Sequence, residues 1–233
     1  MERKTVNEII RSVVGYDVYG IYGEAGVGKT CFVFDLMQKL KVEGWKIAYL
    51  EEQYKDTYSI IDAVEKQLFP ELAVVPDVSN AFRGVLDTVD LSKYAVIIDN
   101  ADMYDEMLKE IYLMLHQAYP LLLVLVGREQ LQEKIVKNNL EVKFQEIYPL
   151  TAKETKAYID DCMRVVGFPK DKISPFSDCI KEIHEVTRGI PFRINIVCET
   201  LLEIAYNRGV KIVSKDMVRE AAKQVAFNNN IKN

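Results

Sequence analysis

The sequence predicts an α/β fold, a parallel sheet sandwiched by helices, followed by a small all-α domain. Two runs, 94–98 and 121–126, are apolar throughout, which is typical of strands buried on both faces of a parallel sheet. Segments with the apolar period of a helix separate the strand-like runs. After Pro149 only helical patterns follow, so the sheet and the all-α domain occupy different parts of the chain.

Each predicted element has its own signal. Short apolar runs predict strands at 16–22, 46–50, 94–99, 121–126 and 144–148. Helical periodicity predicts helices at 6–14, 30–42, 58–69, 82–89, 104–118 and 129–136, and Gly44 and Pro70 end two of them. Three or four more helices are expected, at about 152–166, 176–187, 191–207 and 215–226. We therefore expect a core over 1–149, a helical lid domain over 150–227 and a flexible tail over 228–233.

Composition excludes several classes of protein. Hydrophobic residues make up 49% and charged residues 28% of the 233 positions, as in ordinary globular proteins. No apolar run reaches the roughly 18–20 residues that a membrane span needs. The first residues lack the apolar stretch of a signal peptide, so we expect a cytoplasmic protein without a membrane partner.

Cysteine spacing and charge distribution add weaker constraints. Cysteines at 31, 162, 179 and 198 form no CxxC pair and only two histidines are present, which argues against a zinc site. Reduced thiols are expected, with a Cys162–Cys179 bridge as the alternative. Residues 151–233 carry 14 Lys and Arg against 11 Asp and Glu, whereas residues 1–150 carry 16 against 24. This mildly basic second part permits contact with nucleic acid without specifying it.

One segment indicates a nucleotide-binding site. Residues 23–30 read Gly-Glu-Ala-Gly-Val-Gly-Lys-Thr, which matches the GxxxxGK[ST] loop and lies between a predicted strand and a predicted helix, as that loop must. Its backbone N–H groups and the helix N-terminus attract phosphates, Lys29 should reach the β- and γ-phosphates, and Thr30 should ligate Mg²⁺. The residues expected to bind ATP are Gly23, Glu24, Ala25, Gly26, Val27, Gly28, Lys29, Thr30 and Cys31.

A second motif supplies a carboxylate for the metal. Asp99 follows Ile97 and Ile98 at the end of an apolar strand, and it would hold Mg²⁺ through the metal's water shell, together with Thr30. The alternative is that Asp99 caps the helix that follows.

The group that would activate water for hydrolysis is not defined by a motif. A residue must orient the water in line with the γ-phosphate. The position after Asp99 is Asn100, which is a poor base, so Asp102 is a nearby candidate. Glu51 and Glu52, at the end of the second predicted strand, are alternatives. The sequence therefore predicts ATP binding and leaves the water-activating residue open.

Four later segments, 125–131, 150–159, 189–195 and 205–222, carry a family resemblance. They are similar to strand four and its turn, the opening of a helical lid, a GxP motif and the last lid helices of AAA+ ATPases. The branch they resemble holds secretion-type, transposition-helper and origin-recognition ATPases. The resemblance implies ATP and Mg²⁺ as cofactors, and assembly on double-stranded DNA or a DNA-bound protein. It leaves both a nucleotide-dependent homo-oligomer and a monomer open.

The sequence also departs from that branch. Phe192 stands where the branch commonly has an arginine that touches the γ-phosphate, and Arg193 follows it. Arg128 stands near the usual short polar sensor, and Lys143 stands near the usual arginine finger. With Asn100, these departures predict a slow ATPase. The residues proposed for catalysis are Lys29, Asp99, Asp102, Arg128 and Arg193.

Two other classes resemble parts of the chain. Residues 21–30, 99–101 and 189–191 also look like STAND signalling NTPases, which implies a nucleotide switch that binds a protein partner and barely hydrolyses ATP. The first 55 residues resemble recombinase-type ATPases, which would use Glu51 or Glu52 to activate water. The helical segment after Pro149 argues against the recombinase class.

Overall fold

The computed structural model describes residues 18–51, 53–70, 90–117, 121–169, 172 and 174–231. Among these, 18–25 and 29–147 form one compact unit, and 26–28 with 148–231 form a second. The helices predicted at 6–14 and 82–89, and the candidate Glu52, lie outside the described residues. Within the described part of the chain, no helix is long and apolar enough to cross a membrane.

The first unit is built on a five-stranded parallel sheet, as predicted. Its strands are β1 (Val18–Tyr22), β2 (Lys46–Leu50), β3 (Tyr94–Ile98), β4 (Leu122–Gly127) and β5 (Lys143–Glu146), in the spatial order β2-β3-β4-β1-β5. Every residue of β3 and β4 is buried, which is why both runs are apolar throughout. The carboxyl ends of the five parallel strands therefore meet at one edge of the sheet.

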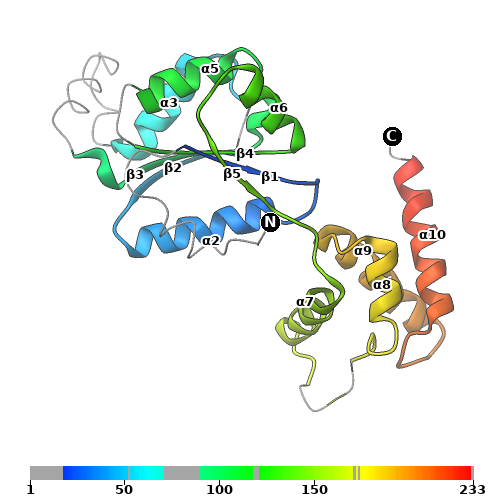
Figure 1. Cartoon of the computed structure of the whole chain (residues 1–233). Helices are drawn as coiled ribbons and strands as arrows, with labels where there is room; N and C mark the ends of the chain where they lie inside the picture. Colours follow the sequence, from blue (N-terminus) through cyan, green and yellow to red (C-terminus); the bar gives the residue numbers. More distant parts are fainter. Residues whose placement is uncertain are drawn as a thin grey trace. The chain divides into compact units, whose positions relative to one another are not determined.

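Helices cover both faces of this sheet (Figure 1). One face packs against α2 (Lys29–Val42), through a core that joins Val33 and Leu36 to Val124 of β4. The other face is covered by α3 (Thr57–Leu68), α5 (Met107–Tyr112) and α6 (Glu129–Lys137). Leu123 belongs to the core on that second face, so neighbouring residues of β4 serve opposite sides of the sheet.

One predicted helix of the first unit differs in its start and in its last turn. Instead of beginning at 104, the helix begins at Met107 as α5 and continues as a π-helical turn, η4 (Leu113–Gln117). It is preceded by a 3-10 turn, η3 (Ala101–Met103), which follows Asn100, a residue with a left-handed backbone and φ of 52°. Apolar periodicity locates a helix but not its first residue or its hydrogen-bond pattern, so these differences were not predictable.

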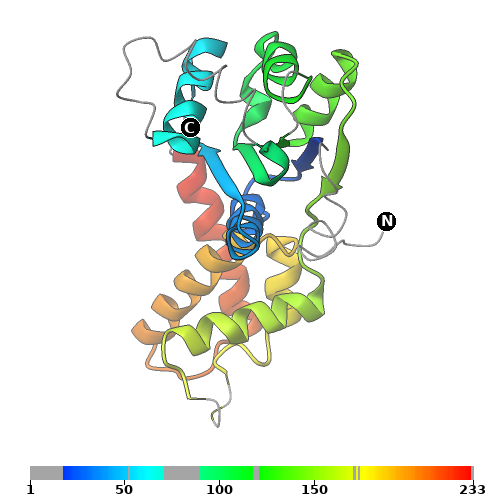
Figure 2. The same ribbon diagram turned by 90° about the vertical axis from the view of Figure 1, so that its left-hand side faces the viewer.

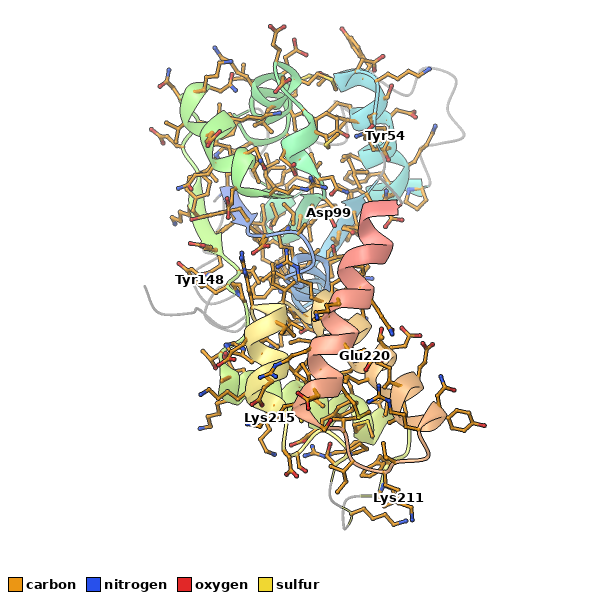
Figure 3. The ribbon with its side chains drawn as sticks, turned by 90° about the vertical axis from the view of Figure 1, so that its right-hand side faces the viewer. Tyr54, Asp99, Tyr148, Lys211, Lys215 and Glu220 are labelled. Carbon is orange, nitrogen blue, oxygen red and sulfur yellow. The ribbon has the colours of Figure 1, made fainter. Side chains whose placement is uncertain are left out.

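The second unit is all helical, with α7 (Ala152–Val165), α8 (Ile180–Thr187), α9 (Pro191–Asn207) and α10 (Lys215–Ile231). α9 packs against α8 and α10 (Figure 2). The ion pairs Arg208–Glu220 and Lys215–Glu182 join α10 to its neighbours, and Figure 3 labels Lys215 and Glu220 on α10. The shared core of this unit includes Ile159, Phe176, Ile183, Ile194, Leu201 and Val218.

Two helix boundaries in the second unit differ from the prediction. α8 begins at Ile180 rather than at 176, because residues 175–179 form turns. α10 continues to Ile231, so the segment predicted as a frayed tail from 228 is helical up to that residue. The asparagines at 228–230 favour a helix end by propensity alone, and here the helix continues through them.

The four cysteines are all free thiols. The alternative Cys162–Cys179 bridge does not form: Cys162 is exposed, whereas Cys179 is buried and its thiol donates a hydrogen bond to the carbonyl of Val213 over 3.2 Å. Burial raises the pKa of the Cys179 thiol. Cys179 is therefore a packing residue of the second unit's core.

Candidate functional site

The loop predicted to bind phosphate joins β1 to the first residue of α2. Gly28, directly before the helix, has φ of 101°, a backbone conformation that side chains disfavour, so glycine is required there. Lys29 begins α2, and its ammonium donates hydrogen bonds to the carbonyls of Gly23 at 2.8 Å and Glu24 at 3.1 Å. The cation is thus held over the start of the loop.

Thr30 and Asp99 belong to two different sequence motifs, and the fold brings their side chains into contact. The Thr30 hydroxyl, in the first turn of α2, donates to Oδ2 of Asp99 over 3.0 Å. Asp99 is buried and directly follows β3 (Figure 3). A hydroxyl and a carboxylate are hard oxygen donors of the kind that Mg²⁺ prefers, so the pair fits the proposed metal ligands.

The helix-capping role considered for Asp99 is not what the structure shows. Its Oδ1 accepts the backbone N–H of Asn100 over 2.8 Å, a contact with its own neighbour. The residue that caps α5 is Glu106, without a side-chain hydrogen bond. Oδ2 is left to face α2, where Thr30 lies.

Asp102 and Arg128 meet at the ends of β3 and β4. Asp102 lies in η3 and is 9% exposed, and its Oδ1 accepts the backbone N–H of Arg128 over 3.1 Å. A Cβ added to Gly127 would lie 2.6 Å from that same oxygen, so glycine allows the close approach. The Arg128 side chain itself is exposed.

The charged groups near Lys29 influence its pKa. Burial lowers the pKa of Lys29, and the carboxylates of Asp102 and Asp99 act in the opposite direction. Arg128 also acts to lower the Lys29 pKa, so Asp99, Asp102 and Arg128 all lie within electrostatic range of Lys29. A half-solvated ammonium flanked by two carboxylates can attract a polyanion and a divalent cation together.

Other residues predicted from the sequence lie elsewhere in the two units. Glu51 is exposed beyond the end of β2. Lys143 begins β5, and its ammonium lies 5.8 Å from the ring centroid of Tyr19, a cation–π contact. Phe192 and Arg193 belong to the first turn of α9 in the second unit, where Phe192 is exposed.

Tyr49 is a site residue that the sequence interpretation missed. Its hydroxyl donates to Oδ2 of Asp99 over 3.1 Å. In the sheet Tyr49 pairs with Ile97, and alternate residues of a strand share a face, so Tyr49, Ile97 and Asp99 face the same side. That register is the signal that could have identified it, but register is known only once β2 is placed beside β3.

No family model matches the chain. General secretion pathway protein A of Aeromonas hydrophila is 27% identical, in a match that covers 84% of this chain and 38% of that protein. The chain therefore spans well under half the length of this curated relative.

Solved structures are similar over nearly the whole chain. Drosophila ORC bound to DNA matches with a TM-score of 0.66 and 15% identity, covering 91% of this chain and 57% of that chain. The ORC2 protein of Aeropyrum pernix, in ADPNP–ADP complexes, matches with a TM-score of 0.62 and 16% identity, covering 94% and 64%. The RuvB Holliday junction branch migration motor of Thermotoga maritima matches with a TM-score of 0.54 and 13% identity, covering 92% and 63%.

At sequence identities this low, structural similarity is evidence for the fold alone. The parallel sheet, the helical second unit and the loop before α2 agree with this structural similarity. The similar structures confirm the predicted fold: this chain has the fold that the ORC and RuvB structures share.

Proposed function

We propose that the chain binds Mg-ATP at the loop over 23–30 and turns it over slowly, coupling its nucleotide state to assembly on DNA or a DNA-bound protein. The observation that carries the binding proposal is the 3.0 Å contact between Thr30 and Asp99 beside the ammonium of Lys29. Lys29 and Thr30, neighbours in the sequence, thereby meet Asp99, 69 positions away, at the edge of the sheet where nucleotides bind in parallel α/β folds.

Each residue has a role in this proposal. Backbone N–H groups of the loop and of the first turn of α2 bind phosphate oxygens. Lys29 neutralises β- and γ-phosphate charge, and Thr30 with Asp99 holds the metal. Bound Mg²⁺ would offset charge on the phosphate oxygens. Arg128 and Arg193 are proposed to respond to the γ-phosphate.

Asp102 is proposed to orient the attacking water. It is buried, lies close enough to Lys29 to act on the lysine's pKa, and follows the strand that supplies Asp99. We expect Asp102→Asn to reduce steady-state phosphate release by about 100-fold, the range of general-base catalysis, without changing ATP affinity.

Glu51→Gln is the matched variant for the recombinase-type alternative. Glu51 is exposed and lies at the end of the neighbouring strand. We expect it to leave phosphate release unchanged. Loss of turnover in Glu51→Gln, with full turnover in Asp102→Asn, would refute the role of Asp102 in favour of that alternative.

The DNA clause rests on the relatives and on charge. One similar structure is of ORC bound to DNA, and another is of a branch migration motor. Residues 151–233 of this chain carry a mildly basic balance. We expect filter binding at low salt to detect nonspecific duplex DNA retention that increases with ATP and falls steeply with added salt. No retention at low salt, with or without ATP, would remove DNA from the proposal.

A nucleotide switch that barely hydrolyses ATP is the second candidate. Asn100 favours it, because this exposed amide follows Asp99 and cannot accept a proton from water. Phe192, in place of an arginine, favours it too. Steady-state phosphate release decides between the two: turnover by the wild type that Lys29→Ala abolishes would refute the switch, and no turnover despite ATP binding would support it.

A further inference from the structure

Asp99 is held by three donors that come from three parts of the first unit. Thr30 of α2 and Tyr49 of β2 donate hydroxyl hydrogens to the same oxygen, Oδ2, over 3.0 and 3.1 Å. The backbone N–H of Asn100 occupies Oδ1. A carboxylate offers about four lone-pair positions, so three donors leave it little rotational freedom and still leave room for a further ligand.

Tyr49 is itself held in place from both sides. Among the strands that the structure describes, β2 lies at the edge of the sheet, and none of them pairs with the outward backbone groups of Tyr49. The side-chain amide of Gln67, from α3, supplies both missing bonds: Tyr49 N–H donates to Oε1 over 2.9 Å, and Nε2 donates to the Tyr49 carbonyl over 3.0 Å. The ring packs against Phe34 of α2, with centroids 5.6 Å apart.

These contacts distinguish Tyr49 from an ordinary packing residue. A tyrosine that served only to pack its ring would not need a hydrogen bond between its hydroxyl and a buried carboxylate. Here the hydroxyl donates to Oδ2 of Asp99, and the same tyrosine is fixed at its backbone by Gln67.

We propose that Tyr49 is a positioning residue that fixes the Asp99 carboxylate for the magnesium–nucleotide complex, and that Gln67 fixes Tyr49. The inference rests on the proposed function, because Asp99 must be the magnesium residue for its orientation to matter. Partners that orient metal-binding carboxylates through hydrogen bonds typically change metal affinity by about 10–100-fold when removed. Tyr49 acts only through Asp99, so it should affect the metal-dependent part of nucleotide binding alone.

Tyr49→Phe tests this, because it removes the hydroxyl and keeps the ring against Phe34. Binding of a fluorescent ATP analogue is measured in excess Mg²⁺, in EDTA, and as a function of Mg²⁺ concentration at fixed nucleotide. We expect the half-saturating Mg²⁺ concentration to rise about 10-fold, with unchanged affinity in EDTA. Tyr58→Phe is the matched control, since Tyr58 on α3 is 82% exposed, and it should behave as the wild type.

Three results would overturn the inference in distinguishable ways. An unchanged Mg²⁺ dependence in Tyr49→Phe, with a wild type that binds Mg-ATP, would refute the role of Tyr49 and spare the proposed function. Equal losses with and without Mg²⁺ would show a packing role for the hydroxyl instead. A wild type that binds no nucleotide would overturn the proposed function, and the inference with it.

Discussion

Replacing Lys29 with alanine is expected to weaken ATP binding by about 100-fold, because hydrogen bonds to charged groups contribute about 1.5–3 kcal/mol. The ammonium is partly buried beside the carboxylates of Asp99 and Asp102. Without it, two negative groups would face the phosphates with no cation from the loop. Isothermal titration calorimetry with Mg-ATP measures the loss, and circular dichroism checks that the variant folds.

Lys41→Ala is the matched control for this prediction. Lys41 is an exposed lysine in the last turn of the same helix, far along α2 from the loop. Its removal should leave ATP affinity unchanged at physiological ionic strength, where exposed charges are screened over about 8 Å. Equal affinities for wild type and Lys29→Ala, or equal losses in both variants, would contradict a specific role for Lys29.

Replacing Gly189 with alanine is expected to destabilise the second unit by at least about 3 kcal/mol, as the sum of a left-handed backbone and an overpacked contact. Gly189 has φ of 68° between α8 and α9. An added Cβ would lie 2.0 Å from the carbonyl oxygen of Leu150, which is backbone and cannot rotate away. The Leu150 N–H also donates to the Gly189 carbonyl over 2.8 Å, so the two segments must separate. Urea denaturation followed by circular dichroism measures the change.

Gly209→Ala separates the backbone effect from the clash. Gly209 follows α9 with φ of 64°, a conformation close to that of Gly189, but an added Cβ there would meet no atom within 4 Å. We expect a loss of about 1 kcal/mol, from the left-handed conformation alone. Similar losses in the two variants would show that the approach of Leu150 does not constrain Gly189.

The sheet was predictable from sequence because its central strands are buried on both faces. β3 and β4 have no room for a polar side chain, so they appear as apolar runs, and the loop before α2 has a strict residue pattern. The GxP resemblance at 189–191 also has a physical basis, since the Gly189 backbone and the Leu150 carbonyl require glycine. These features depend on local residue patterns or on composition, and both can be read from a single sequence.

Features that depend on tertiary contacts were not predictable. The hydroxyl of Tyr49 reaches Asp99 only because β2 pairs with β3 in one register. Gln67 appears in the sequence as one of several polar positions on α3, although it completes the edge of the sheet. The turn at 101–103 follows from the left-handed backbone of Asn100, which its residue type permits but does not dictate.

A calorimetric titration of the wild-type protein with ATP, in Mg²⁺ and in EDTA, tests most directly whether the loop over 23–30 and Asp99 form one magnesium–nucleotide site. We predict a single site per chain whose affinity is higher in Mg²⁺ than in EDTA, since Thr30 and Asp99 lie together beside Lys29. No binding of any nucleoside triphosphate in Mg²⁺, or an affinity that does not respond to the metal, would contradict that assignment.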